Sequence, residues 1–155
     1  MRIGIMTGGG DCPGLNAVIR AVVRKGVSAY NDEFLGFVDS WDGVMEQRYM
    51  TLGESDVRGL LPRGGTILGT RRGSPYDSSD GIERVKKCFA EQNLDGLIVI
   101  GGNGSLTVSS LIYTETGLPI IGVPKTIDND VYGTDLTFGL HTAVQIATDA
   151  IDRLH

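Results

Sequence analysis

The stretch Asp95-Gly-Leu-Ile-Val-Ile100, followed directly by Gly101-Gly-Asn-Gly-Ser105, decides the fold that we expect for this chain. Its first part is a near-continuous apolar run, which is typical of a strand covered on both faces of a parallel sheet. Its second part is a glycine-rich turn, and a helix is predicted from Leu106 to Thr116. A buried strand that leads through a tight turn into a helix is the repeating unit of α/β proteins.

The same pattern stands at the start of the chain, where a strand over residues 2–7 and a turn over 8–14 precede a helix over 15–30. Further strands are predicted at residues 33–38 and 119–124, and further helices at 80–93 and from Gly139 to the C-terminus. We therefore predict an α/β fold with three layers, a mostly parallel sheet and helices on both faces (Rossmann-like). Between Asp39 and Gly81 the pattern predicts no element.

The composition fits one globular domain of 155 residues with a net charge of −5. That charge argues against a nucleic-acid partner, and no apolar run approaches the ~18 residues of a membrane span. The start lacks the pattern of a signal peptide. Because Cys12 and Cys88 are too few for a disulfide framework, we expect a reducing, cytoplasmic location. The 23 glycines amount to about twice the usual ~7%.

Three segments follow predicted strands and would form one rim of the sheet: residues 8–14, 101–105 and 125–130. Ligands of such sheets bind at the carboxyl ends of the strands. Glycine lets backbone amides approach a phosphate, and a helix N-terminus adds partial positive charge. The usual fingerprints are absent, because the chain has no Gly-Lys dipeptide and the dinucleotide motif lacks its third glycine in both loops. The alternative is that these glycines serve only tight turns.

The segment Pro124-Lys-Thr-Ile-Asp-Asn-Asp130 carries the chemistry. In an extended segment, Asp128 and Asp130 would point to one side, since they lie two residues apart. One carboxylate would accept a proton from an attacking hydroxyl while the other holds a cation or orients the first. Lys125 and Thr126 suit phosphate oxygens. The alternative is a solvated turn in which both aspartates cap backbone amides.

Together these segments resemble the phosphofructokinase family, in particular its bacterial subgroup that mixes ATP and pyrophosphate users. The similarity covers the whole chain in the family's order. Its motifs are residues 8–20, 64–72, 101–105 and 124–130, with 133–135 and 137–139 after them. Because family members are longer, the resemblance implies that residues 1–155 form an incomplete, N-terminal donor-binding domain, cut within its final helix. We expect this chain alone to have negligible kinase activity.

The resemblance assigns roles on the acceptor side to the segment after Pro124. Asp128 matches the base that takes the proton from the 1-hydroxyl of fructose 6-phosphate, and Asp130 an acidic neighbour important for the magnesium-bound reaction. Thr126 and Ile127 match substrate-side positions. On the donor side, the residues that match ATP-binding positions are Gly10, Arg72, Gly73, Gly102, Asn103, Gly104 and Ser105. Arg20 matches an effector-site position.

Three positions bear on the metal and the donor. Asn103 stands where the family usually has an aspartate that helps to hold Mg²⁺, and its amide offers an oxygen without charge. Lys125 is typical of pyrophosphate users and of the mixed subgroup. Gly104 stands where pyrophosphate users carry an aspartate that would repel the nucleotide α-phosphate. Since Gly104 leaves room for a nucleotide, ATP is the expected donor and pyrophosphate the alternative.

Three classes of function stay open at this point. The first is a magnesium-dependent, glycolytic 6-phosphofructokinase that converts fructose 6-phosphate to fructose 1,6-bisphosphate and is a homo-oligomer when complete. The second is a nucleotide-binding module without catalysis, which Asn103 favours. The third is another kinase with a glycine-glycine-acidic-glycine loop, which leaves the segments 64–72 and 125–130 unexplained.

Overall fold

The computed structural model describes residues 1–154 as a five-stranded sheet with helices packed on it. The strand order is β3-β2-β1-β4-β5, with β3 antiparallel to β2 and all other neighbours parallel. The strands are β1 (Arg2–Thr7), β2 (Glu33–Phe37), β3 (Tyr49–Leu52), β4 (Gly96–Gly101) and β5 (Ile120–Pro124). The predicted α/β, mostly parallel, Rossmann-like arrangement is confirmed, and β1, β4 and β5 are neighbours in the sheet.

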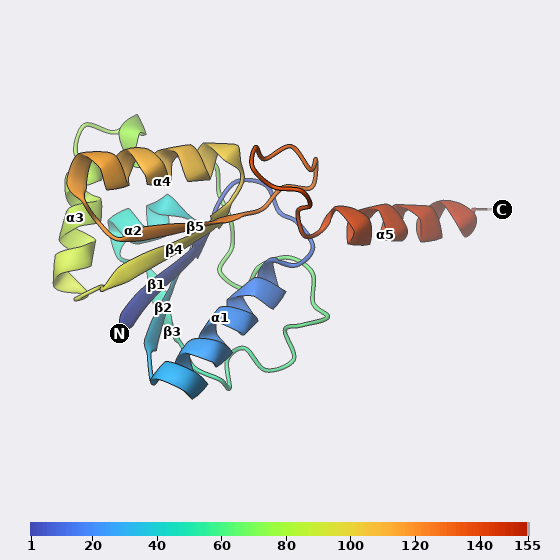
Figure 1. The fold of residues 1–155 in the computed structure, drawn as a ribbon, viewed down its shortest axis with the longest axis horizontal. Helices are drawn as coiled ribbons and strands as arrows, with labels where there is room; N and C mark the ends of the chain where they lie inside the picture. Colours follow the sequence, from blue (N-terminus) through green and yellow to red (C-terminus); the bar gives the residue numbers. More distant parts are fainter. Residues whose placement is uncertain (155) are drawn as a thin grey trace.

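Helices cover both faces of the sheet (Figure 1). They are α1 (Leu15–Tyr30), α2 (Trp41–Glu46), the 3₁₀ helix η1 (Pro75–Asp77), α3 (Gly81–Glu91), α4 (Asn103–Thr116) and α5 (Leu140–Asp152). The helices α2, α3 and α4 pack on one face, and α1 packs on the other. Alternation along the strands divides the core in two, since Met6 and Val99 face the first layer while Ile5 and Ile100 face α1. The loop between β3 and η1 completes the α1 side through Val57, Leu60 and Leu68.

Two differences from the prediction lie close to the expected ligand edge. Helix α4 begins at Asn103 rather than Leu106, because Gly102 takes an extended conformation as its N-cap. Asn103, Gly104 and Ser105 therefore form the first helical turn instead of a loop. The unassigned region contains α2, β3 and η1, and it begins with Asp39 and Ser40 in positive φ.

The final helix α5 stands apart from the rest of the molecule. It extends away from the carboxyl edge of the sheet (Figure 1), and none of its residues is buried. The predicted helix ran from Gly139 to the C-terminus, and its last residue, His155, lies outside the described residues. Across residues 1–154, the structure has no helix with the length and apolar character that crossing a membrane requires.

Candidate active site

The loops that follow β1, β4 and β5 meet at the carboxyl edge of the sheet and surround a pocket of about 440 Å³. We call it the carboxyl-edge pocket. Its walls come from the turn after β1, the segment before η1, the first turns of α4 and the end of β5. The lining residues are Gly9, Gly10, Arg71, Arg72, Gly73, Ser74, Asp77, Gly102, Gly104, Ser105, Val108 and Lys125.

The N-terminus of α4 forms one wall of this pocket. Its N-cap, Gly102, provides no side chain to bond the first backbone N–H groups of the helix. A β-carbon added at Gly104 would meet no atom within 4 Å, so this wall is open. Free N–H groups and the helix dipole make such a terminus attractive to an anion such as phosphate.

Lys125 places a buried positive charge at the pocket. Its side chain is 5% exposed, and Nζ donates a hydrogen bond to the backbone oxygen of Gly10 at 2.5 Å. It makes no ion pair with any of residues 1–154. Because a buried charge without a counter-charge is costly, the pocket favours an anionic ligand beside Lys125.

Two arginines add to this charge. The glycine turn after β1 is tied to their segment, since Gly9 N–H bonds the Arg71 oxygen at 3.3 Å and Thr70 Oγ1 donates to the Gly9 oxygen at 2.8 Å. Arg71 Nη1 lies 2.8 Å from Asp42 Oδ2, whereas Arg72 forms no ion pair within residues 1–154. Sequence reasoning selected only Arg72; the available signal for Arg71 was the adjacent pair of arginines itself.

A buried asparagine in α1 anchors the start of the arginine segment. Asn16 Nδ2 donates to the backbone oxygens of Arg63 and Gly64, and Asn16 Oδ1 accepts from the N–H of Ile67. The side chain is 1% exposed, so it is buried with its polar atoms bonded. Asn16 thereby connects α1 to the segment that brings the arginines to the pocket.

The segment after β5 is folded differently from our expectation. We predicted an extended segment, and this is wrong. The backbone turns, with Asn129 at φ 55°, so the two-residue alternation is lost. The Thr126 hydroxyl organises the turn: it donates to Asp130 Oδ1 at 2.8 Å and accepts from the N–H of Asp128 at 3.1 Å. Asp130 is thus held, while the exposed Asp128 makes no ion pair among the described residues.

A second contact closes this loop eleven residues later. The buried Thr137 donates its hydroxyl to the backbone oxygen of Thr126 at 2.8 Å. Its N–H donates to Asn129 Oδ1 at 2.9 Å, so the αL residue Asn129 is fixed through its side chain. Sequence reasoning gave neither Asn129 nor Thr137 a role, because a contact across the loop leaves no local pattern.

The predicted site residues fall into two adjoining groups. Those that line the pocket are Gly10, Arg72, Gly73, Gly102, Gly104, Ser105 and Lys125. Those outside its lining are Asn103, Thr126, Ile127, Asp128 and Asp130. The groups meet where the Asn103 amide nitrogen lies 3.5 Å from the backbone oxygen of Asp130. The structure therefore brings the donor-side and acceptor-side segments together, while the roles of the individual residues stay predictions.

The oxygen atoms near this junction suit Mg²⁺ only in part. Asn103, Asp128 and Asp130 offer the amide and carboxylate oxygens that this ion prefers. Within residues 1–154, no cluster of three His, Cys, Asp or Glu side chains could hold a metal ion. The residues therefore fit an ion that is shared with substrate phosphates, which is a common way for Mg²⁺ to be bound.

Cys12 and Arg20 lie beyond the pocket lining. Burial raises the pKa of the Cys12 thiol, although the nearby charge of Lys125 acts in the opposite direction. The Cys12 side chain is buried. Arg20 lies with Arg24 and Arg58 in a separate basic pocket.

Comparison with known proteins adds the family context. The family model described as Phosphofructokinase matches residues 2–155. A Streptomyces coelicolor protein named pyrophosphate–fructose 6-phosphate 1-phosphotransferase is 56% identical over the whole chain, which covers 45% of that protein. ATP-dependent 6-phosphofructokinase 3 of the same organism is 54% identical over 99% of the chain, again covering 45% of that protein. The structure of phosphofructokinase from Saccharomyces cerevisiae superposes with a TM-score of 0.90 at 32% identity, over 99% of this chain and 24% of that one.

Proposed function

This chain belongs to the phosphofructokinase family, and we propose that it forms the donor-binding and base-carrying part of an ATP-dependent 6-phosphofructokinase. The chain spans about 45% of the length of the curated relatives named above. The observation that carries the proposal is the buried, unpaired Lys125 in a cationic pocket, next to a loop that presents an exposed aspartate. The family match also removes the third hypothesis, a kinase of another family.

On the donor side, the pocket holds the polyphosphate. The N-terminus of α4 receives phosphate oxygens through Gly104 and Ser105, and Arg72 and Lys125 neutralise their charge. Gly10 lets the backbone approach the phosphates. Catalysis of phosphoryl transfer consists mainly of such positioning and charge stabilisation.

On the acceptor side, Asp128 accepts the proton of the 1-hydroxyl of fructose 6-phosphate. The hydroxyl oxygen forms a bond to the γ-phosphorus while the bond from that phosphorus to the bridging oxygen breaks, which leaves ADP. Thr126 and Ile127 contact the acceptor, and Asp130 is kept in place by Thr126. Asp128, Asp130 and Asn103 would hold Mg²⁺, whose charge would be available to neutralise the transferred group.

The choice of ATP rests on Gly104. This residue lines the pocket, and a β-carbon there meets nothing within 4 Å, so the wall is open to the nucleotide α-phosphate. Pyrophosphate is the second candidate, because Lys125 is typical of its users and a relative 56% identical is named for it. In the complete protein we propose a cytoplasmic, glycolytic homo-oligomer.

Chimeras test the proposal directly. Residues 1–155 replace the matching segment in two Streptomyces coelicolor relatives, the one named for pyrophosphate and the one named for ATP. Phosphorylation of fructose 6-phosphate is measured with each donor, using the unaltered relatives as controls. We expect both chimeras to use ATP. Donor use that follows the host would place donor choice outside this chain, and two folded but inactive chimeras would favour the non-catalytic nucleotide-binding module.

A further inference from the structure

Residues 64–72, which bring Arg71 and Arg72 to the carboxyl-edge pocket, form neither a helix nor a strand. The fully buried side chain of Leu68 anchors this segment in the core on the α1 side of the sheet. An apolar anchor holds a segment against the core but does not fix the direction of its backbone, because apolar contact is non-directional. The direction in which the two arginines leave the segment therefore depends on hydrogen bonds.

The hydrogen bonds start from Thr7, the last residue of β1. Its side chain is 0% exposed and, like that of Ile5 two residues earlier, points to the α1 side. The Thr7 hydroxyl donates to the backbone oxygen of Gly69 at 2.6 Å and lies 3.0 Å from Thr66 Oγ1. A hydroxyl has one proton, and Thr7 gives its own to Gly69, so Thr66 is the donor between the two hydroxyls. The three residues thus form one chain of hydrogen bonds with a fixed direction.

The other ends of this chain are fixed too. Thr66 Oγ1 accepts from the N–H of Leu68 at 3.1 Å, and the Leu68 oxygen accepts from the N–H of Asp39 at 2.9 Å. Gly69 has φ 68°, and a β-carbon there would lie 2.6 Å from Asp39 Oδ1. The segment is therefore clamped between the end of β1 and the connection after β2, directly before its backbone reaches the arginines.

The next residues connect this clamp to the pocket. Thr70 and Arg71 bond the backbone oxygen and the N–H of Gly9, and Lys125 Nζ bonds the oxygen of Gly10. Two successive residues of the turn that follows Thr7 thus hold the arginine segment on one side and the buried lysine on the other. A shift of the segment at its contact with Thr7 would move the guanidinium groups relative to Lys125.

We infer that Thr7 is a positioning residue of the donor site: its buried hydroxyl fixes where the arginine segment places its guanidinium groups, and thereby sets donor affinity. The inference rests on the proposed function for the role of the arginines. Thr7 does not line the pocket and would not touch the donor. Since its side chain is fully buried, its contacts all lie within residues 1–154. If Thr7 only stabilised the fold, its replacement would lower the stability of the protein and leave the donor affinity of the folded protein unchanged.

Thr7→Val in the chimera with the Streptomyces coelicolor relative named for ATP tests this inference. Valine has a similar shape but leaves the Gly69 oxygen and the Thr66 hydroxyl without their partner. ATP affinity, measured by calorimetry, should fall by about tenfold, because a displaced guanidinium loses a charge-assisted hydrogen bond to phosphate. Thr7→Ser keeps the hydroxyl and should stay within about twofold of the unaltered chimera. The KM for fructose 6-phosphate should not change, since Thr126 and Thr137 fix the acceptor-side loop independently.

Thr116→Val is the matched control. The half-buried Thr116 also donates one hydrogen bond, to the Ile112 oxygen, and accepts one, from the N–H of Leu118. It lies at the C-terminal end of α4, at the edge of the sheet opposite the pocket. This variant should lower the melting temperature as Thr7→Val does but leave ATP affinity unchanged. If Thr7→Val prevents folding, Thr66→Val interrupts the same chain of hydrogen bonds at a half-buried position and takes its place.

A double-mutant cycle separates this inference from the proposed function. In a background with Arg71→Met and Arg72→Met, Thr7→Val should cause no further loss of ATP affinity, because the groups that it positions are gone. A loss of the same size in that background, an unchanged affinity in Thr7→Val, or an equal loss in Thr7→Ser would each overturn the inference and leave the proposed function standing. If removal of both arginines has no effect on ATP affinity, the proposed donor site and this inference are both wrong.

Discussion

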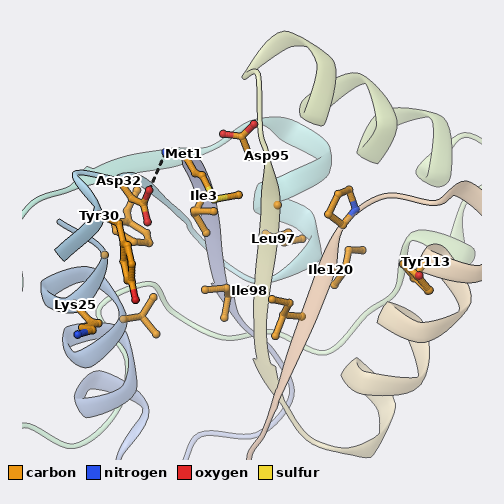
Figure 2. A pocket seen from close by; sticks show the side chains of 16 residues that line it. Met1, Ile3, Lys25, Tyr30, Asp32, Asp95, Leu97, Ile98, Tyr113 and Ile120 are labelled. Carbon is orange, nitrogen blue, oxygen red and sulfur yellow. Dashed lines mark hydrogen bonds and ion pairs between the residues drawn. The ribbon is translucent and has the colours of Figure 1, made fainter. Parts of the chain in front are cut away.

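The carboxyl-edge pocket and a second cavity, which we call the amino-edge groove, have nearly the same volume but opposite chemistry. The pocket, of about 440 Å³, is lined by glycines, two arginines and Lys125. The groove, of about 450 Å³, lies at the amino ends of the strands and is lined mainly by apolar side chains, among them Ile3, Leu97 and Ile98 (Figure 2). The volume of a cavity therefore says little about the chemistry of the ligand that it would bind. The direction of the parallel sheet decides which ligand fits, because helix N-termini and glycine-rich turns lie at the carboxyl edge. The groove, in contrast, is an apolar face of the sheet that no described element covers.

Among the changes considered, Asp128→Asn should alter the chemistry at the carboxyl edge most strongly. In a chimera with an S. coelicolor relative, this change removes the proton acceptor and keeps the shape. Turnover should fall by about 10²–10⁴-fold, whereas ATP affinity, measured by calorimetry, should stay the same. Asn129→Asp, which adds charge at the neighbouring position, shows what a general electrostatic change does. Wild-type turnover in Asp128→Asn would remove Asp128 as the base.

Gly104→Asp sharpens the contrast between the pocket's two candidate donors. The added carboxylate would project from an open wall and repel the nucleotide α-phosphate. ATP affinity should fall by at least about tenfold, or about 1.4 kcal/mol, while pyrophosphate affinity changes less. Ser110→Asp places the same charge on an exposed position of α4 away from the pocket and serves as the control. Equal losses for both donors would contradict the argument from Gly104.

A smaller effect is expected from Asp42→Asn. This change releases Arg71 from its ion pair and leaves its guanidinium free to face the pocket. Exposed ion pairs contribute about 0–1 kcal/mol, so donor affinity should rise by up to about fivefold. Arg71→Met should lower it, and Glu46→Gln, which breaks an exposed pair of Arg48, should leave it unchanged. Identical affinities in all variants would show that Arg71 takes no part.

The smallest effect concerns the rim of the groove. The hydrogen bond from the Met1 amino group to Asp32 raises the pKa of that amino group in the folded chain. This contribution to stability is complete below the unfolded-state pKa and is lost as pH rises through the folded-state pKa. Denaturation across that alkaline range should show the loss in the wild type and not in Asp32→Asn. ATP affinity should be the same in both proteins, since the amino group lies at the opposite edge.

The glycine-rich turns and the buried strands made most of the fold predictable. The apolar run before Gly101 and the matching start of the chain identify β4, β1 and the edge at which ligands bind. The antiparallel β3 and the six-residue α2 were not predicted from the sequence. Both are short, and they form through contacts with β2 and α3 rather than through a periodic pattern. A periodic pattern of apolar residues reveals helices and strands that bury one face along several turns or residues. Short elements are too brief to show such a pattern.

The site was predictable as a set of segments but not as a geometry. The residue types in the pocket follow from chemistry that the sequence displays, since glycine, arginine and lysine suit phosphate. The turn at Asn129 was missed because it is fixed by Thr137, eight residues away, through a contact that only the folded chain creates. For the same reason the segment from Lys125 to Asp130 was wrongly expected to be extended.

The central position of β1 also determines when this protein can acquire its shape during synthesis. Of the five described strands, β1 is made first and lies in the middle of the sheet, and its partner β4 starts at Gly96, which pairs with Ile3. At ribosomal speeds of about 5–20 residues per second, the strand waits roughly 5–20 s for that partner. The last wall of the pocket, Lys125, arrives later still. The newborn chain must therefore keep an apolar strand out of wrong pairings for seconds, a period in which unpaired strand edges are prone to aggregate.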